Sequence, residues 1–203
     1  VLNRRPDGYH EIRSIMQSVD LADLLHFYPA PADEFSCSDK TLPAGPDNLA
    51  WRARQLFAAR CDKPLRPFHI HLEKRIPAGA GLGGGSADAA AVLRALNQLH
   101  NTPFDLQTLQ EMAAELGSDV PFLVDGGTAL VRGRGEILEP LQWRGAVWYT
   151  LVYPNVEVST AWAYAQVSPG LTAASSYLSF IDSLSGGCVE GSALFPLLEN
   201  DFQ

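Results

Sequence analysis

The 203-residue sequence predicts a fold that mixes strands and helices, and two observations indicate it. Apolar Phe68, Ile70 and Leu72 alternate with polar residues, as in a half-buried strand. The run from Ser86 to His100 is rich in Ala and Leu and has its large apolar residues at helical spacing. Between these two elements lies the stretch Pro77–Asp88, in which five of the twelve residues are Gly.

A glycine-rich turn between a strand and a helix has the properties of a phosphate-binding site. Gly residues tolerate positive φ and let a ligand approach the main chain closely. The first N–H groups of a helix have no partners within the helix and lie at the positive end of its dipole. The order of strand, Gly run and helix therefore predicts that residues 77–88 bind an anion, in preference to the plainer interpretation of a flexible surface loop.

Residues 77–88 do not match well with two common types of phosphate-binding loop. No Lys follows the glycines, as a loop of the G-x-x-x-x-G-K-[ST] type requires. Gly79, Gly81 and Gly84 fit dinucleotide-binding spacing, but a Gly run matches almost any Gly pattern. The acidic ribose ligand of that motif would fall near Asp105, which is better explained as a helix cap. A phosphate loop of another type remains, in which Ser86 can contact phosphate or Mg²⁺.

The rest of the chain is predicted to contain both kinds of element. Strands are predicted over Arg13–Val19, Leu24–Tyr28, Thr128–Arg132 and Val147–Tyr153. Helices are predicted over Leu49–Arg60, Leu106–Leu116 and Ser159–Gln166, the first capped by Asp47 or Asn48 and the second by Asp105. The apolar spacing in residues 11–20 also fits a helix, but the alternation there favours a strand.

Composition and charge restrict the class of protein. The apolar content of 46% and charged content of 19% are typical of a soluble globular protein, and no apolar run is long enough to span a membrane. A net charge of −8 argues against a general nucleic-acid binder. The cysteines are odd in number and scattered, which favours a reduced, cytoplasmic compartment. His69 and His71 lie on the polar face of a strand without a third ligand nearby, so no metal site is predicted.

Two short segments carry candidate functional side chains. Asp119 lies in the Gly117–Phe122 break between a helix and apolar residues, where a kinase could use it to position or deprotonate an attacking hydroxyl. It could also cap a short helix starting at Val120, and the two roles can coexist. Tyr9 and His10 follow a Pro-Asp-Gly turn. Such a pair can stack on a base and hydrogen-bond its edge, although a turn with a packed Tyr is the simpler interpretation of this feature alone.

Together these segments resemble the GHMP small-molecule kinases. The pattern Pro77-x-x-x-Gly81-Leu82-Gly83-x-x-Ser86-x-Asp88-Ala89-Ala90 is similar to the central ATP-binding motif of that family. The other matching segments, in the family order, are Arg5–Glu11, Asp47–Leu49, Gly117–Phe122, Gly126–Ala129 and Arg132–Glu136. The Asp-Gly-Tyr-His run in the first of them narrows the resemblance to the branch that acts on a cytidine-diphosphate-linked methylerythritol.

The resemblance implies the α+β GHMP kinase fold with two domains. Residues 1–144 would form an ATP-binding domain of the ribosomal protein S5 domain 2-like type. Residues 145–203 would begin a ferredoxin-like, substrate-side domain, with the active site in the cleft between the two. The implied reaction transfers the γ-phosphate of ATP to the 2-hydroxyl of 4-diphosphocytidyl-2-C-methyl-D-erythritol in non-mevalonate isoprenoid synthesis, with Mg²⁺ screening the phosphates.

Two alternatives to this reaction remain at the level of sequence. Another GHMP kinase, acting on homoserine, mevalonate or a sugar, would lack a pair of rings that stack on a base. A nucleotide-binding protein without catalysis is the alternative from a different class.

The resemblance also implies roles for individual residues. The cofactor-binding set would be the loop and two residues at the adenosine end of ATP: Pro77, Ala78, Gly79, Ala80, Gly81, Leu82, Gly83, Gly84, Gly85, Ser86, Asn48 and Lys74. Tyr9 and Tyr164 would stack on either side of the cytosine, and His10 would read its edge. Asp119 would be the catalytic base, and Thr160 would lie near the substrate.

Two elements of the family pattern are not seen in the sequence. The family begins with a strand that carries Pro-x-Lys-x-Asn, whose Lys is expected beside the catalytic Asp, and it ends with a second Gly/Ser-rich loop that contacts phosphate. Ser185-Gly186-Gly187 is not a convincing substitute for that loop. We therefore expect both ends to be cut from a longer protein, and the chain alone to have little kinase activity and poor solubility.

Overall fold

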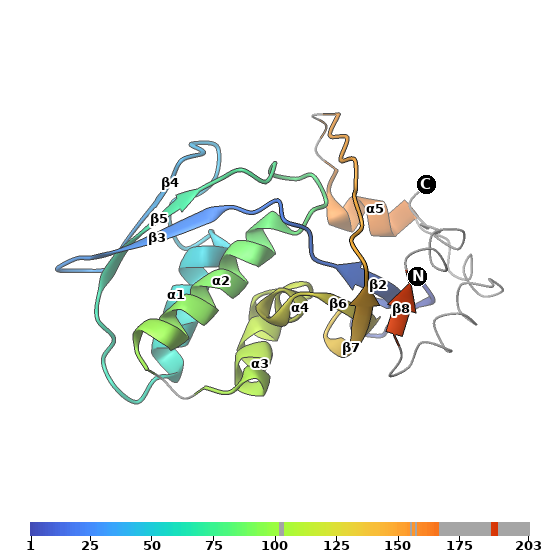
Figure 1. Ribbon diagram of the computed structural model, residues 1–203. Helices are drawn as coiled ribbons and strands as arrows, with labels where there is room; N and C mark the ends of the chain where they lie inside the picture. Colours follow the sequence, from blue (N-terminus) through green and yellow to red (C-terminus); the bar gives the residue numbers. More distant parts are fainter. Residues whose placement is uncertain (102–103, 155, 157, 167–187, 191–203) are drawn as a thin grey trace. The chain divides into compact units, whose positions relative to one another are not determined.

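The computed structural model describes residues 1–101, 104–154, 156, 158–166 and 188–190 (Figure 1). The chain forms two compact units: residues 19–125, and residues 1–18 together with 126–203. We call the first the loop unit, because it contains the glycine-rich loop, and the second the sheet unit. Each is described by itself.

The loop unit packs helices against a three-stranded sheet. Its strands β3 (Leu24–Pro29), β5 (Phe68–Glu73) and β4 (Glu34–Cys37) lie in the order β3-β5-β4. β3 is antiparallel to the central strand β5, and β4 is parallel to it. The helices are α1 (Leu49–Arg60), α2 (Gly84–Leu99), α3 (Leu106–Leu116) and α4 (Val120–Asp125). In Figure 1, α1 and α2 lie together against this sheet, so the glycine-rich loop joins its central strand to a helix that covers it.

The core of the loop unit forms where the buried face of β5 packs against the apolar faces of the helices. Every second side chain of β5 is buried, namely Phe68, Ile70 and Leu72. The cluster that contains Phe68 and Ile70 also includes Phe57, Val92, Leu93, Leu96 and Met112 from the helices. Burial of one such side chain contributes about 1.5–3 kcal/mol, so this cluster fixes the position of α2 under the loop.

The sheet unit is built on a five-stranded sheet. Its strands β1 (Asn3–Arg4), β2 (His10–Gln17), β6 (Thr128–Gly133), β7 (Ile137–Arg144) and β8 (Cys188–Glu190) lie in that order. All neighbours are antiparallel except β7 and β8, which are parallel. The Nε2 of Gln17 donates a 3.2 Å hydrogen bond to the carbonyl of Gly127, so the turn that starts β6 is held to the end of β2. Helix α5 (Thr160–Gln166) follows β7 in the chain.

Most of the predicted elements are present, with ends that move by at most three residues. The strand favoured in residues 11–20 is β2, and the short helix proposed after Asp119 is α4. Asn48, not Asp47, caps α1, and Asp105 caps α3 by accepting a 2.8 Å hydrogen bond from the N–H of Thr108. Ser185–Gly187 lies outside the described residues.

The predicted buried strand Val147–Tyr153 is wrong. These residues have no strand conformation, and Trp148 and Val152 are 92% and 85% exposed. Their apolar composition suggested a core strand, but a strand needs a partner, and among the described residues β7 ends at Arg144. The sequence did not predict β7, nor did it predict the short strands β1 and β8.

None of the helices in the described ranges has the length and the hydropathy that crossing a bilayer requires.

The core of the loop unit can be tested with two adjacent positions on α2. Leu93→Ala should lower the free energy of unfolding by about 2–5 kcal/mol in urea titrations, because Leu93 is fully buried. The neighbouring Arg94 is exposed, so Arg94→Ala should change the free energy of unfolding by less than about 0.5 kcal/mol. Equal effects at the two positions would contradict the packing described for α2.

Candidate functional site

The glycine-rich loop takes a backbone course that other residues resist. Gly79, Gly81 and Gly83 have φ of 67°, 71° and 68°, in the left-handed region. Gly83 is also the N-cap of α2 and makes no side-chain capping hydrogen bond. The N–H groups of the first turn of α2 are therefore left without a side-chain cap, which is the arrangement that accepts a phosphate.

The end of the loop is packed closely on three sides. A Cβ on Gly84 would lie 3.0 Å from Cγ2 of Ile76, and a Cβ on Gly85 would lie 3.7 Å from Cδ1 of Leu49. A Cβ on Gly83 would lie 3.6 Å from Cδ1 of Leu123 in α4. The residues that follow β5, the first turn of α1 and α4 thus all meet at the start of α2.

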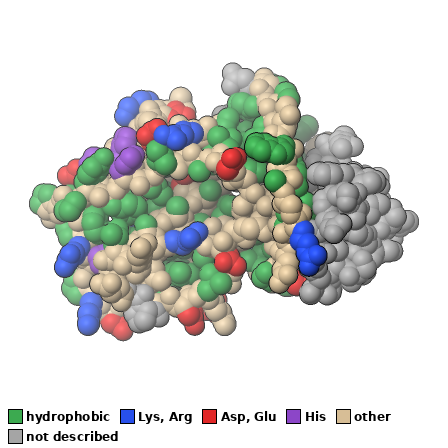
Figure 2. All heavy atoms as spheres, viewed as in Figure 1, with side chains coloured by type: hydrophobic (Ala, Val, Ile, Leu, Met, Phe, Trp, Pro, Cys, Tyr) green, Lys and Arg blue, Asp and Glu red, His purple; other side chains and the backbone are tan. Residues whose placement is uncertain are grey.

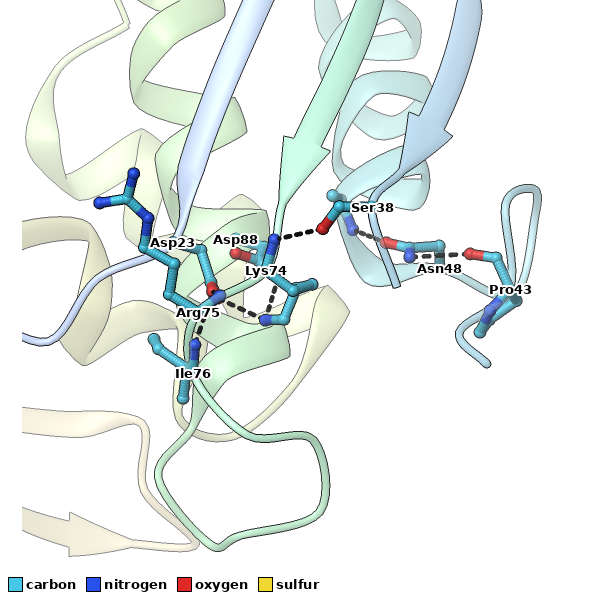
Figure 3. Close-up of polar contacts among 9 residues, drawn as sticks. Asp23, Ser38, Pro43, Asn48, Lys74, Arg75, Ile76 and Asp88 are labelled. Atoms are coloured by element: carbon cyan, nitrogen blue, oxygen red, sulfur yellow. Dashed lines mark hydrogen bonds and ion pairs between the residues drawn. The ribbon is translucent and has the colours of Figure 1, made fainter. Parts of the chain in front are cut away.

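A buried ion-pair network lies at the base of the loop (Figure 3). The ammonium of Lys74 pairs with the carboxylate of Asp23, and it lies 2.9 Å from Oδ2 of Asp88 on α2. Oδ1 of Asp23 also accepts hydrogen bonds of 2.5 Å and 2.8 Å from the N–H groups of Arg75 and Ile76. The side chains of Lys74, Asp23 and Asp88 are 7%, 3% and 5% exposed. We call these three residues the Lys74 network.

The pKa values of the two carboxylates in the Lys74 network are shifted in opposite directions. Burial raises the pKa of Asp88 to about 7, against the opposing effect of Lys74. Burial acts in the same sense on Asp23, but the hydrogen bonds from the N–H groups of Arg75 and Ile76 and the ion pair with Lys74 bring its pKa below the usual value. For Lys74, burial acts to lower the pKa, but its bonds to the two carboxylates outweigh this effect and raise it.

Asn48 begins α1 beside the loop and uses both ends of its amide. Its Oδ1 accepts a 2.9 Å hydrogen bond from the N–H of Ala50, and its Nδ2 donates a 2.9 Å hydrogen bond to the carbonyl of Pro43. Both interactions are with the protein, and the side chain is buried (Figure 3). Asn48 therefore orders the segment that leads into α1, next to Leu49 and the loop.

Asp119 immediately precedes α4, the helix that contacts the loop through Leu123. The carbonyl of Asp119 accepts a 3.3 Å hydrogen bond from the N–H of Leu123. Burial raises the pKa of its side chain above the usual value. A carboxylate with a raised pKa is a better proton acceptor, as a general base requires.

The sheet unit contains the residues predicted to bind a base, and two of them are in contact. The rings of His10 and Tyr164 are stacked with centroids 5.0 Å apart and planes inclined by 26°. Tyr9 is 49% exposed, and the guanidinium of Arg134 lies 5.0 Å from the centre of its ring. Thr160 is the exposed first residue of α5, the helix that carries Tyr164.

His69 and His71 belong to a polar surface on the sheet of the loop unit. The Oγ of Ser36 lies 2.7 Å from Nε2 of His69 and 2.8 Å from Nδ1 of His71, and His26 lies opposite His71. Figure 2 shows histidine side chains gathered over these strands. Within the described residues no group of three or more His, Cys, Asp or Glu side chains could hold a metal ion.

The loop unit thus holds Asn48, Lys74, residues 77–86 and Asp119, and the sheet unit holds Tyr9, His10, Thr160 and Tyr164. Sequence reasoning missed the roles of Asp23 and Asp88. Asp88 is a charged residue among the Ala residues of the first turns of α2, where the helix faces the core. This placement was a signal that its carboxylate is buried and has a partner. The pairing of Asp23 with Lys74, 51 residues apart, left no signal in a single sequence.

Comparisons with known proteins place this fold in one class. The family model described as the GHMP kinases N terminal domain matches residues 48–127. A homoserine kinase from Cytophaga hutchinsonii shares the fold, with a TM-score of 0.57 and 22% identity over 79% of this chain and 55% of that one. The chain thus has the GHMP kinase fold, as the sequence predicted.

Similarity to particular relatives is more specific. A solved 4-(cytidine 5'-diphospho)-2C-methyl-D-erythritol kinase has a TM-score of 0.72 and 35% identity, over 100% of this chain and 70% of that one. The 4-diphosphocytidyl-2-C-methyl-D-erythritol kinase of Geobacter sulfurreducens is 41% identical over 100% of this chain and 71% of its own length. The kinase of the same name from Pelotomaculum thermopropionicum is 50% identical over 84% of this chain and 60% of its own length.

The chain belongs to the family of 4-diphosphocytidyl-2-C-methyl-D-erythritol kinases, and the predicted resemblance is confirmed. The first relatives that it matches are covered over 60% and 61% of their own length.

Two adjacent glycines at the start of α2 test the packing of the loop. Gly85→Ala should leave the free energy of unfolding unchanged or raise it by up to about 1 kcal/mol, because Ala favours helix and its Cβ would make an ordinary 3.7 Å contact. Gly84→Ala should lower the free energy of unfolding, because its Cβ would lie 3.0 Å from Ile76. Urea titration of both variants checks this, and a stabilised Gly84→Ala variant would contradict the tight contact.

Proposed function

We propose that the protein phosphorylates the 2-hydroxyl of 4-diphosphocytidyl-2-C-methyl-D-erythritol with ATP, in the non-mevalonate route to isoprenoid precursors. The observation that carries the proposal is the similarity to the Geobacter sulfurreducens kinase, which extends over the whole chain at 41% identity. The positive-φ loop and the uncapped start of α2 support it from the physical side.

The residues of the loop unit fit the phosphates of ATP. Residues 77–86 would hold them through main-chain N–H groups, and a Cβ on Gly81 would have no atom within 4 Å, which leaves room for a ligand. Asn48 and Lys74 would lie at the adenosine end. Bound ATP supplies the phosphoryl group that is transferred. Mg²⁺ would take most of its ligands from phosphates and water, because the described part of the chain contains no group of three or more His, Cys, Asp or Glu side chains that could hold a metal ion.

Asp119 would act as the general base. It would accept the proton of the 2-hydroxyl as the oxygen attacks, and would later release the proton to solvent. The burial that raises its pKa strengthens it as a proton acceptor. Activity would therefore fall on the acid side, as Asp119 becomes protonated.

The sheet unit would recognise the cytidine end of the substrate. Tyr9 and Tyr164 would stack on the cytosine, and the ring nitrogens of His10 would hydrogen-bond its edge. Thr160 would contact the substrate from the start of α5. The stacking of His10 on Tyr164 supports a shared role for these two rings.

The remaining features of the sequence-based prediction are part of the same proposal. Residues 1–144 would form the ATP-binding domain, and residues 145–203 would begin the substrate-side domain. The protein would act in the cytoplasm on a small molecule, without nucleic acid or membrane as partner. A GHMP kinase for homoserine, mevalonate or a sugar is the alternative that cytidine binding excludes.

Binding of cytidine diphosphate tests the base site. Tyr9→Ala and Tyr164→Ala should each weaken binding about tenfold or more in calorimetric titrations, because loss of one stacked ring removes about 1–3 kcal/mol. Tyr28→Ala is the matched control, since Tyr28 is equally exposed on the other unit. Unchanged affinity in both test variants would favour another GHMP kinase.

Turnover tests the role of Asp119. Asp119→Asn should lower kcat by at least about 100-fold, because the amide cannot accept the proton, while the affinity for ATP stays within a factor of about three. The assay uses the protein as its complete reading frame encodes it. Ser118→Ala is the neighbouring control, expected to retain turnover. A variant Asp119→Asn that turns over at the parent rate would exclude this residue as the base.

A further inference from the structure

Three segments that are distant in sequence meet at the ammonium of Lys74. Asp23 precedes β3, Lys74 follows β5, and Asp88 lies one turn into α2. The main chain on the β5 side is held as well, because Asp23 accepts hydrogen bonds from the N–H groups of Arg75 and Ile76. The glycine-rich loop lies between Lys74 and Asp88 in the sequence, so the network holds the two ends of the loop close to each other (Figure 3).

The network also touches the loop directly. A Cβ on Gly84, the first residue of α2, would lie 3.2 Å from Nζ of Lys74. Any displacement of the ammonium therefore changes the space available to the first turn of α2, whose N–H groups would face the phosphates.

We propose that Asp23 and Asp88 are positioning residues of the phosphate site, which act through Lys74 to hold the two ends of the glycine-rich loop at a fixed separation. The proposal rests on the proposed function only in taking the ligand to be the phosphates of ATP. Neither carboxylate contacts the nucleotide in this account. They act by fixing the start of α2 against the end of β5.

The network contains one more negative charge than positive charge. Two carboxylates share one ammonium, and all three side chains are at least nine-tenths buried. In the described part of the chain, the Cys37 thiol and Asp39 near the end of β4 also interact electrostatically with Lys74. Neither supplies a second cation, so a proton on one carboxylate balances the charge.

Because one carboxylate of the network can bind this proton, the assembly of the loop depends on pH. The pKa of Asp88 is raised to about 7 by burial, so Asp88 binds a proton more tightly in the assembled loop than in an opened one. The contribution of this proton to assembly is therefore fully present below about pH 4, the usual pKa of an exposed Asp, declines as the pH rises, and is lost above about pH 7. Phosphates, being anionic, should also bind more tightly when Asp88 is protonated.

Hydrogen exchange of the loop in the nucleotide-free chain tests the proposal without requiring any ligand. In Asp88→Ala the amides of residues 87–90, which are the first hydrogen-bonded amides of α2, should exchange at least tenfold faster than in the parent, after correction for intrinsic rates. Asp88→Asn should stay within about threefold of the parent, because its amide oxygen can accept from Lys74 and carries no excess charge. Protection in the parent should fall between about pH 5 and about pH 7 and level off above pH 7, and Asp88→Asn should lose this dependence. Asp20→Asn is the matched control, since Asp20 is an exposed acid three residues before Asp23.

Ligand titrations then separate positioning from general destabilisation. Asp88→Ala should weaken binding of ATP at least tenfold and leave the affinity for cytidine diphosphate unchanged. The proposal is overturned if exchange in Asp88→Ala matches the parent, if Asp88→Asn is as damaging as Asp88→Ala, or if both affinities fall together. If the parent itself fails to bind ATP, the proposed function fails, and the exchange data still decide the role of the network.

Discussion

The ammonium of Lys74 is held between two buried carboxylates, and the course of the glycine-rich loop depends on that arrangement. Leaving one member of a buried ion pair without its partner costs about 3–5 kcal/mol, so the three side chains have little freedom to separate. The constraint passes to the main chain through the N–H groups of Arg75 and Ile76 on one side and through α2 on the other. Gly is favoured at position 84, because a Cβ there would lie 3.0 Å from Cγ2 of Ile76 and 3.2 Å from Nζ of Lys74.

The carboxylates of the loop unit differ in function because their surroundings differ. Asp23 receives two main-chain N–H bonds and an ammonium, which lower its pKa and keep it ionised. Asp88 shares the same ammonium, but burial and the nearby charge of Asp23 raise its pKa to about 7. Asp119 has its pKa raised by burial. A structural anion, a proton-binding group and a candidate base thus arise from one residue type.

Local signals in the sequence were enough to predict the loop, the caps and the helices. The Gly run, Asn48 and Asp105 act through neighbours within a few residues, so a single sequence reveals them. The sequence did not correctly predict the strands that depend on pairing between distant segments. Pro140 argues against a strand, yet β7 accommodates it because β8 pairs with β7 only at Gln142–Arg144 among the described residues. The apolar run Val147–Tyr153 predicted a strand for which the described residues supply no partner.

Amide chemical shifts measured during titration with a non-hydrolysable ATP analogue and Mg²⁺ test the central claim most directly. The largest shifts should occur in residues 78–86 and in the first turn of α2, where main-chain N–H groups would bind the phosphates. Saturable shifts confined to other parts of the chain, with this segment unchanged, would contradict it.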